Sequence, residues 1–166
     1  MTGQLMHYAE LPVSFDAART YEQKQPRLFG KPEGFWVSVT GEDDWPSWCE
    51  SEEFRQSTLQ AAHRVELAAG ANFLRIDSTV GIDSLTARFA VQTEYERRWA
   101  HRGDTPAKWP IDWQRVAEQW DGIIIAPYQW ARRNTHDWYY GWDCASGCIW
   151  NLAAIESVQL VAEVTA

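Results

Sequence analysis

The sequence predicts a single α+β domain over residues 1–166, with a mixed or mostly antiparallel sheet and about three helices. Strand-like and helix-like segments do not alternate regularly: strand patterns come first, helical patterns occupy the middle, and strand patterns return at the end. The 166 residues suffice for one domain with a substantial core. A hydrophobic fraction of 45% with 23% charged residues is typical of a globular protein.

Strands are expected first at residues 4–8 and then at residues 35–39, a run rich in aromatic and β-branched side chains. The polar residues 16–24 between them fit either a short helix or an ordered loop. Residues 63–67 and 72–77 alternate polar and apolar side chains, which predicts a hairpin or two neighbouring strands.

Three helices are expected in the middle of the chain. Asp44 can cap the first, with Pro46 in its first turn. Apolar residues recur at helical spacing from residue 84 to residue 99, which predicts the second helix, and residues 112–120 predict the third.

Three more strands are expected toward the C-terminus. Residues 123–126 are consecutively apolar and lie between Asp-Gly and Pro, which is typical of a buried strand. Residues 148–150 form a short strand pattern, and residues 155–161 alternate as a half-exposed strand does.

Composition limits the classes of function. Eleven tryptophans indicate either an aromatic-lined cleft or a core built from tryptophan layers. A net charge of −8 argues against a broadly basic face for nucleic acid, although a local basic patch stays possible. Signal-peptide and membrane-span patterns are absent, and three cysteines complete no disulfide framework. A cytoplasmic protein with reduced thiols and no membrane partner is the simplest expectation.

The segment WYYGWDCASGCIW contains two cysteines, Cys144 and Cys148. A structural zinc site needs four ligands, usually two well-separated pairs. Here there is one pair of cysteines, with His136 nearby. We therefore expect Cys144 and Cys148 to be buried packing residues and not metal ligands. A nucleophilic cysteine stays open as an alternative, because His136, Arg132 and Arg133 lie near in sequence. No phosphate-binding loop, zinc-protease or serine-hydrolase motif occurs.

Taken in order, several segments resemble the ADP-ribosyltransferase fold. In that superfamily the first strand carries a His or Arg that holds NAD, the second carries Ser or Tyr near its end, and late strands hold the catalytic acid. Met6-His7-Tyr8 is similar to the first strand, and KPEGFWVS, which ends at Ser38, is similar to the second. The segments WDGIIIAP and SGCIWNLAAI are similar to late strands of small bacterial members. KPxGxWxS and WDxxSGCIW are also similar to segments of actinobacterial and phage proteins, a likeness that implies no activity.

The resemblance implies that NAD is the substrate and that ADP-ribose passes to a protein or nucleic-acid acceptor. The family's catalytic acid is expected where this chain has Ser146, which is not an acid. Asp143 is the only acid in this segment, so it takes the catalytic role in this interpretation, together with His7.

Polar and aromatic side chains are expected to hold the ligand, since nicotinamide stacks on aromatic rings and polar donors hold ribose and phosphate. These residues are Tyr8, Trp36, Ser38, Tyr128, Arg132, Arg133, Tyr139, Tyr140, Trp142 and Ser146. The two arginines could meet the diphosphate, and a solvated loop is their alternative.

Two functions from different classes stay open. The strand order, His7 and Ser38 favour an ADP-ribosyltransferase-like enzyme that uses NAD. The serine at position 146 and the net charge favour a non-catalytic, acidic, tryptophan-rich binding module, which would sequester a nucleotide-like ligand or inhibit a host protein.

Overall fold

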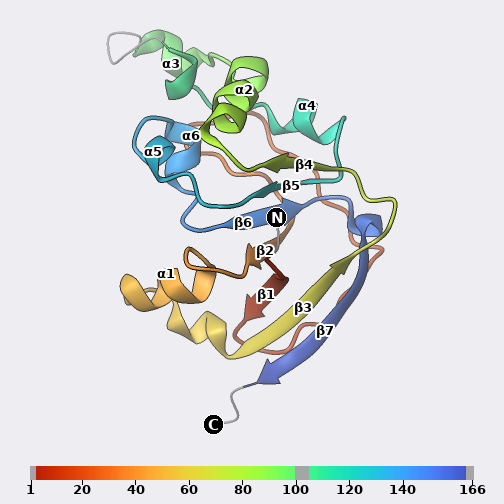
Figure 1. Ribbon diagram of the computed structural model, residues 1–166. Helices are drawn as coiled ribbons and strands as arrows, with labels where there is room; N and C mark the ends of the chain where they lie inside the picture. Colours follow the sequence, from red (N-terminus) through yellow and green to blue (C-terminus); the bar gives the residue numbers. More distant parts are fainter. Residues whose placement is uncertain (1–2, 100–104, 164–166) are drawn as a thin grey trace.

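Seven strands form one mixed sheet in the order β4-β5-β6-β2-β1-β3-β7 (Figure 1). The computed structural model describes residues 3–99 and 105–163. Strands β4 and β5 are parallel, and the other neighbouring pairs are antiparallel. The predicted single α+β domain with a mixed sheet is therefore confirmed.

The strands follow the apolar and alternating runs of the sequence. Their bounds are β1 (Leu5–Ala9), β2 (Phe35–Val39), β3 (Ala61–Leu67), β4 (Phe73–Ile76), β5 (Gly122–Ile125), β6 (Ser146–Ile149) and β7 (Ile155–Glu163). All four residues of β5 are buried, as the consecutive apolar run indicates. The polar residues 16–24 form no helix or strand.

The described residues contain six α-helices, so the expected number of about three is wrong. They are α1 (Trp45–Ser51), α2 (Thr79–Phe89), α3 (Glu94–Arg98), α4 (Trp113–Ala117), α5 (Trp130–Arg133) and α6 (Asp137–Tyr140). Helices α5 and α6 are single turns of four residues, too short to produce a recognisable apolar period. None of the helices in the described ranges has the length and apolar character that crossing a membrane requires.

The helix expected over residues 84–99 is two helices with a break at residues 90–93. Thr93 starts α3 with a capping box, in which the Glu96 side chain bonds back to the Thr93 backbone N–H. Within the break, the Val91 N–H donates to the Pro110 carbonyl at 2.9 Å. The break therefore arises from a second capping signal and a tertiary backbone contact.

The hairpin expected from residues 63–67 and 72–77 does not form. Strand β3 pairs with β1 and β7, whereas β4 lies at the far edge of the sheet and pairs with β5. The turn before β4 is held to the start of β5, since Asn72 N–H donates to the Asp121 carboxylate at 2.8 Å and Asp121 N–H returns a bond to the Asn72 carbonyl. Alternation predicted both strands correctly but could not identify their partners.

Aromatic side chains fill much of the core. Helices α2 to α6 gather near β4, β5 and β6, while α1 lies beside β1 and β2 (Figure 1). On the helical side, Trp113, Trp138, Tyr139 and Trp142 contact one another at ring-centroid distances of 5.4–6.3 Å. Three of the eleven tryptophans thus belong to one aromatic cluster in the core.

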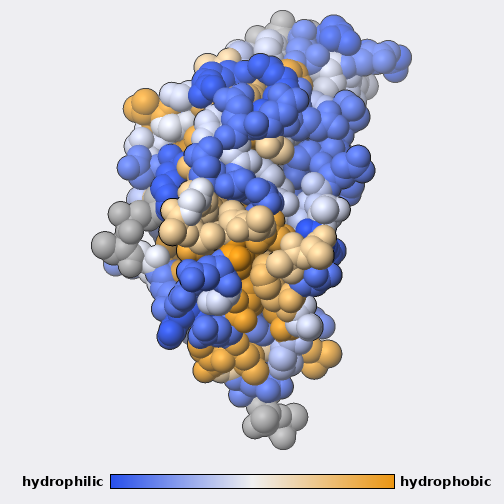
Figure 2. All heavy atoms as spheres, turned by 90° about the vertical axis from the view of Figure 1, so that its right-hand side faces the viewer, coloured by the Kyte–Doolittle hydropathy of each residue, from blue (hydrophilic) through white to orange (hydrophobic). Residues whose placement is uncertain are grey.

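The opposite edge of the sheet is strand β7. Its outer part exposes Leu160 and Val161. Figure 2 views the right-hand side of Figure 1, where apolar residues gather over the middle and lower half and hydrophilic residues cover the upper end. The helical end of the molecule therefore has the more polar surface on this side.

The sheet opens in its middle, between β1 and β2. These strands pair only at Leu5 with Val39 and at Met6 with Ser38, whereas β1 and β3 pair over five positions. Beyond the two pairs, the His7 imidazole Nδ1 lies 2.8 Å from the Trp36 carbonyl oxygen. The His7 side chain thus bonds to β2 where the backbones of β1 and β2 no longer pair.

Candidate functional site

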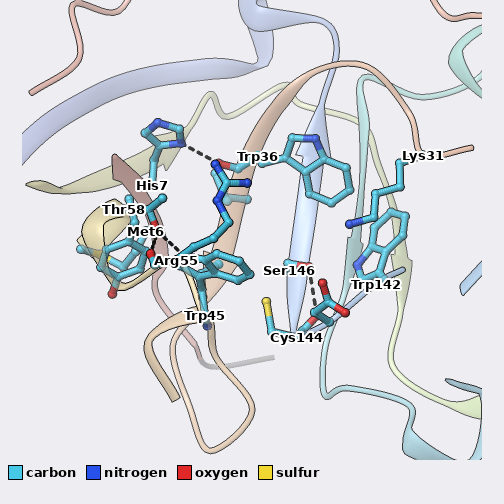
Figure 3. A pocket seen from close by; sticks show the side chains of 14 residues that line it. Met6, His7, Lys31, Trp36, Trp45, Arg55, Thr58, Trp142, Cys144 and Ser146 are labelled. Atoms are coloured by element: carbon cyan, nitrogen blue, oxygen red, sulfur yellow. Dashed lines mark hydrogen bonds between the residues drawn. The ribbon is translucent and has the colours of Figure 1, made fainter. Parts of the chain in front are cut away.

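A pocket of about 330 Å³ lies at this opening (Figure 3). Its walls come from β1, from β2 with the preceding Lys31, from the start of β6 with the loop before it, and from α1 with the following 3-10 helix Gln56–Leu59. The volume is at the lower end of the range of about 300–1,000 Å³ that is typical of small-molecule sites. Divergence of two central strands therefore creates the main candidate site in the described residues.

The pocket contains most of the side chains expected at the site. Seven of the twelve line it, contributed by three neighbouring strands and one loop: His7, Tyr8, Trp36, Ser38, Trp142, Asp143 and Ser146. Trp36 and Trp142 pack edge to face with ring centroids 5.0 Å apart. Segments more than a hundred residues apart thus form one aromatic wall.

The two serines line the pocket but already have hydrogen-bond partners. Ser38 Oγ accepts from the Trp45 N–H at 2.9 Å, at the first turn of α1. Ser146 Oγ donates to the Cys144 carbonyl at 2.9 Å. Both hydroxyls are buried, and these bonds order the backbone around the pocket.

His7 lies at the margin of the pocket. Successive strand residues face opposite sides of the sheet, so its ring faces away from Met6 and Tyr8. The ring stacks on Phe35 with centroids 4.2 Å apart. Burial lowers the pKa of His7, and the bond to the Trp36 carbonyl opposes that shift in part. A neutral imidazole joins β1 and β2 here.

Asp143 is the only carboxylate among the described residues that line the pocket. Its Oδ1 is 3.4 Å from Arg133 Nη1, and its side chain is 26% exposed. The same Arg133 nitrogen donates to the Tyr128 hydroxyl at 2.9 Å. Burial raises the pKa of Tyr128 to about 12, so its phenol is neutral at physiological pH. Arg133 therefore holds Asp143 from behind the pocket wall.

Five expected site residues do not line the pocket. Tyr128 and Arg133 lie behind it, and Arg132 forms a two-pronged ion pair with Asp83, with both N–O distances 2.7 Å. Tyr139 is fully buried, and its hydroxyl accepts from the Gln129 N–H at 3.0 Å. Tyr140 points outward and is 52% exposed. These five residues therefore lie outside this pocket, and their contact with a ligand stays a prediction.

Two cations that sequence reasoning missed, Lys31 and Arg55, line the pocket. The Lys31 ammonium is 5.1 Å from the centroid of the Trp36 ring. Neither side chain has a hydrogen bond or ion pair within the ranges the structure describes. Lys31 belongs to the quoted KPEGFWVS segment and could have been identified there, whereas no sequence pattern marks Arg55.

The cysteines are largely buried, although Cys144 also lines the pocket. All three are buried and unpaired, and Cys148 Sγ lies 3.6 Å from the Pro32 carbonyl oxygen. Burial raises the pKa of Cys144 to about 12 and that of Cys148 well above its ordinary value. Protonated thiols are poor nucleophiles, which disfavours cysteine catalysis. Among the described residues, no three or more His, Cys, Asp or Glu side chains are grouped as metal ligands.

Comparison with known proteins finds no matching family model, no matching curated protein and no matching solved structure.

Proposed function

We propose that this chain binds NAD or a related nucleotide in the pocket between β1 and β2. The observation that carries the proposal is the combination of tryptophan walls, from Trp36, Trp45 and Trp142, with the two cations Lys31 and Arg55. Aromatic rings stack on planar bases, and ammonium or guanidinium groups hold phosphate oxygens. This local positive charge occurs in a chain of net charge −8.

The arrangement of strands supports the same proposal. The resemblance to ADP-ribosyltransferases requires a His-bearing strand, a Ser-bearing strand and the strand of the catalytic acid to act on one ligand. Here β1 with His7, β2 with Ser38 and β6 with Ser146 are consecutive in the sheet. The pocket volume of about 330 Å³ leads us to expect that it encloses one nucleoside part and leaves the other at the open mouth.

Calorimetric titration with NAD, ADP-ribose and nicotinamide mononucleotide tests the proposal, and a single-site isotherm for at least one is expected. Trp36→Leu removes a stacking surface worth about 1–3 kcal/mol, so affinity should fall about 5-fold to 150-fold. Trp130→Leu is the matched control, because Trp130 is exposed and lies outside the pocket. Absence of binding to all three ligands by the folded wild-type protein would overturn the proposal.

Transfer of ADP-ribose is the second part of the proposal, with Asp143 as the catalytic acid. Cleavage of the bond between nicotinamide and ribose develops positive charge on the sugar, which a nearby carboxylate stabilises. Nicotinamide release should be lost in Asp143→Asn while NAD binding is retained. Asp83→Asn, whose carboxylate pairs with Arg132 outside the pocket, is the control.

A non-catalytic binding module is the second candidate. Three observations favour it: Ser146 replaces the expected acid, both pocket serines have intramolecular partners, and Arg133 partly neutralises Asp143. The two candidates are separated by incubating wild-type protein with NAD and mixtures of protein and nucleic-acid acceptors. NAD binding without nicotinamide release supports the module, and release that depends on Asp143 supports the transferase.

A further inference from the structure

We propose that the space between Lys31 and Trp142 on one wall of the pocket and Arg55 on the opposite wall is an oxyanion subsite that takes a phosphate group of the ligand. This inference deepens the proposed function and rests on it for the identity of the whole ligand. The ligand would be a phosphorylated compound. Its phosphate would be held by Lys31, Arg55 and Trp142, and not by His7, Ser38 or Asp143.

Trp142 supplies an unused hydrogen-bond donor. Its side chain is buried, with 1% of the residue exposed, and its indole Nε1 has no acceptor among the described residues. Buried N–H groups without partners are rare in native proteins. Other atoms of Trp142 line the pocket, but Nε1 itself is buried, so a ligand acceptor would satisfy this donor only after a shift of the neighbouring side chains. An indole N–H is a donor only, so the missing partner must present a lone pair.

Lys31 places a positive charge beside this donor. A Cβ built on Gly141, the residue before Trp142, would lie 3.2 Å from Lys31 Cε, so the lysine stem runs alongside this segment. Figure 3 shows the Lys31 ammonium and the Trp142 indole together at one wall, with the ammonium turned into the pocket. Burial lowers the pKa of Lys31. A bound anion would favour the charged ammonium and oppose that shift.

Arg55 approaches from the other side of the pocket. Its backbone adopts the left-handed conformation, with φ 48°, immediately before the 3-10 helix Gln56–Leu59. Figure 3 shows its side chain extending into the space between His7 and Trp36. Strained backbone conformations persist where the surrounding structure determines them, and they are common at ligand sites. Two cations thus face one pocket from opposite walls.

The pocket lining has two cations, Lys31 and Arg55, and one carboxylate, Asp143, whose charge also acts on Lys31, so its balance of charge is positive. Within the described residues, no carboxylate lies within 4.0 Å of the Lys31 or Arg55 charged nitrogens, whereas Asp143 is already 3.4 Å from Arg133. An oxyanion between an ammonium, a guanidinium and an indole N–H would gain charge-assisted hydrogen bonds from all three. Phosphate has enough acceptor oxygens to engage them together, which a neutral nucleoside does not.

The test follows indole N–H resonances of ¹⁵N-labelled full-length protein by NMR during titration with inorganic pyrophosphate. The Trp142 resonance is assigned by its loss in Trp142→Phe, or by through-bond assignment of the wild-type protein if that variant does not fold. We expect this resonance to move and saturate with pyrophosphate but not with sodium chloride of equal ionic strength. AMP should bind at least tenfold more tightly than adenosine.

Lys31→Met removes the ammonium and keeps the apolar stem, so it should weaken pyrophosphate binding at least tenfold. Lys24→Met is the matched control, since Lys24 forms a surface ion pair with Glu33 outside the pocket. An unmoved Trp142 resonance, or equal affinities of wild type and Lys31→Met, overturns the subsite even if calorimetry shows that NAD binds. Pyrophosphate binding that requires Lys31 but is not displaced by NAD, ADP-ribose or nicotinamide mononucleotide supports the subsite and overturns the proposed function.

Discussion

Ser38 in β2 pairs directly with Ser146 in β6, so the two buried serines lie on one face of the sheet and both line the pocket. Each hydroxyl bonds to backbone, Ser38 to the Trp45 N–H and Ser146 to the Cys144 carbonyl. The positions that the family resemblance would assign to ligand contact thus hold the pocket walls in place. The proposed contacts with a phosphorylated ligand therefore come from other side chains of the pocket, above all from Lys31 and Arg55.

The first prediction concerns the hydroxyl of Ser38. Ser38→Ala should lower the free energy of unfolding by about 1–3 kcal/mol, because it leaves the Trp45 N–H at the start of α1 without its acceptor. Urea unfolding followed by tryptophan fluorescence measures this change. NAD affinity, corrected for the folded fraction, should stay within about twofold of wild type, a change of less than 0.5 kcal/mol.

Ser51→Ala is the control for this variant, because the Ser51 hydroxyl is exposed and bonds only to the Trp48 carbonyl within its own helix. It should change stability by less than about 0.5 kcal/mol. A Ser38→Ala protein with unchanged stability and much weaker NAD binding would show that the hydroxyl contacts the ligand instead.

The second prediction is a pH dependence of stability from His7. Burial lowers the pKa of folded His7 below its ordinary value of 6.5, so the unfolded chain binds a proton at higher pH than the folded protein does. Its contribution to stability is therefore complete above pH 6.5 and is lost as the pH falls from there through the lowered pKa. Urea unfolding at intervals between pH 8 and pH 5 measures the loss.

His7→Gln removes the titration and retains a donor for the Trp36 carbonyl, so stability should fall less steeply with decreasing pH than in wild type. Part of the slope should persist, because burial also lowers the pKa of His136. A slope unaltered by His7→Gln would assign the pH dependence to other histidines.

Much of the strand content could be predicted, because each strand carries a local pattern. The aromatic and β-branched run of β2 and the apolar run of β5 are recognisable without their partners. Partner choice depends on contacts between distant residues, and the turn of Asn72 is decided by Asp121, 49 residues later. Local alternation contains no such information, so the expectation of a hairpin or two neighbouring strands was wrong.

Most of the pocket residues that could be predicted belong to strands, and Trp142 and Asp143, in the loop before β6, are the exceptions. Trp36 and Ser38 follow from the pattern of β2, but Arg55 depends on a left-handed backbone residue that no periodicity marks. In α6, Tyr139 is buried and Tyr140 exposed, since successive helical residues point about 100° apart. Chemical type alone could not separate these two tyrosines.

The third prediction concerns the thiols. Burial raises the pKa of Cys144 from 9.0 to about 12, which lowers its thiolate fraction at pH 8 about a thousandfold. Native protein should therefore react very slowly with Ellman's reagent at pH 8, and all three thiols should react within minutes in concentrated urea. Rapid modification of one thiol in the native state, mapped by mass spectrometry, would restore cysteine chemistry as a candidate.

The final prediction separates backbone strain from ligand contact at Arg55. Arg55 and Glu53 both adopt left-handed backbone conformations, with φ 48° and 49°, but only Arg55 lines the pocket. Glycine adopts this conformation without steric penalty yet loses more chain entropy on folding. Arg55→Gly and Glu53→Gly should therefore both unfold within about 1 kcal/mol of wild type in urea.

Ligand binding should distinguish these two glycine variants. A hydrogen bond to a charged group contributes about 1.5–3 kcal/mol, so loss of the guanidinium should weaken binding of pyrophosphate and NAD about 10-fold to 150-fold in Arg55→Gly. Glu53→Gly should bind both as wild type does in the same calorimetric titration. Equal weakening in the two variants would attribute the effect to the backbone of this segment, and weakening in neither would show that the guanidinium does not contact the ligand.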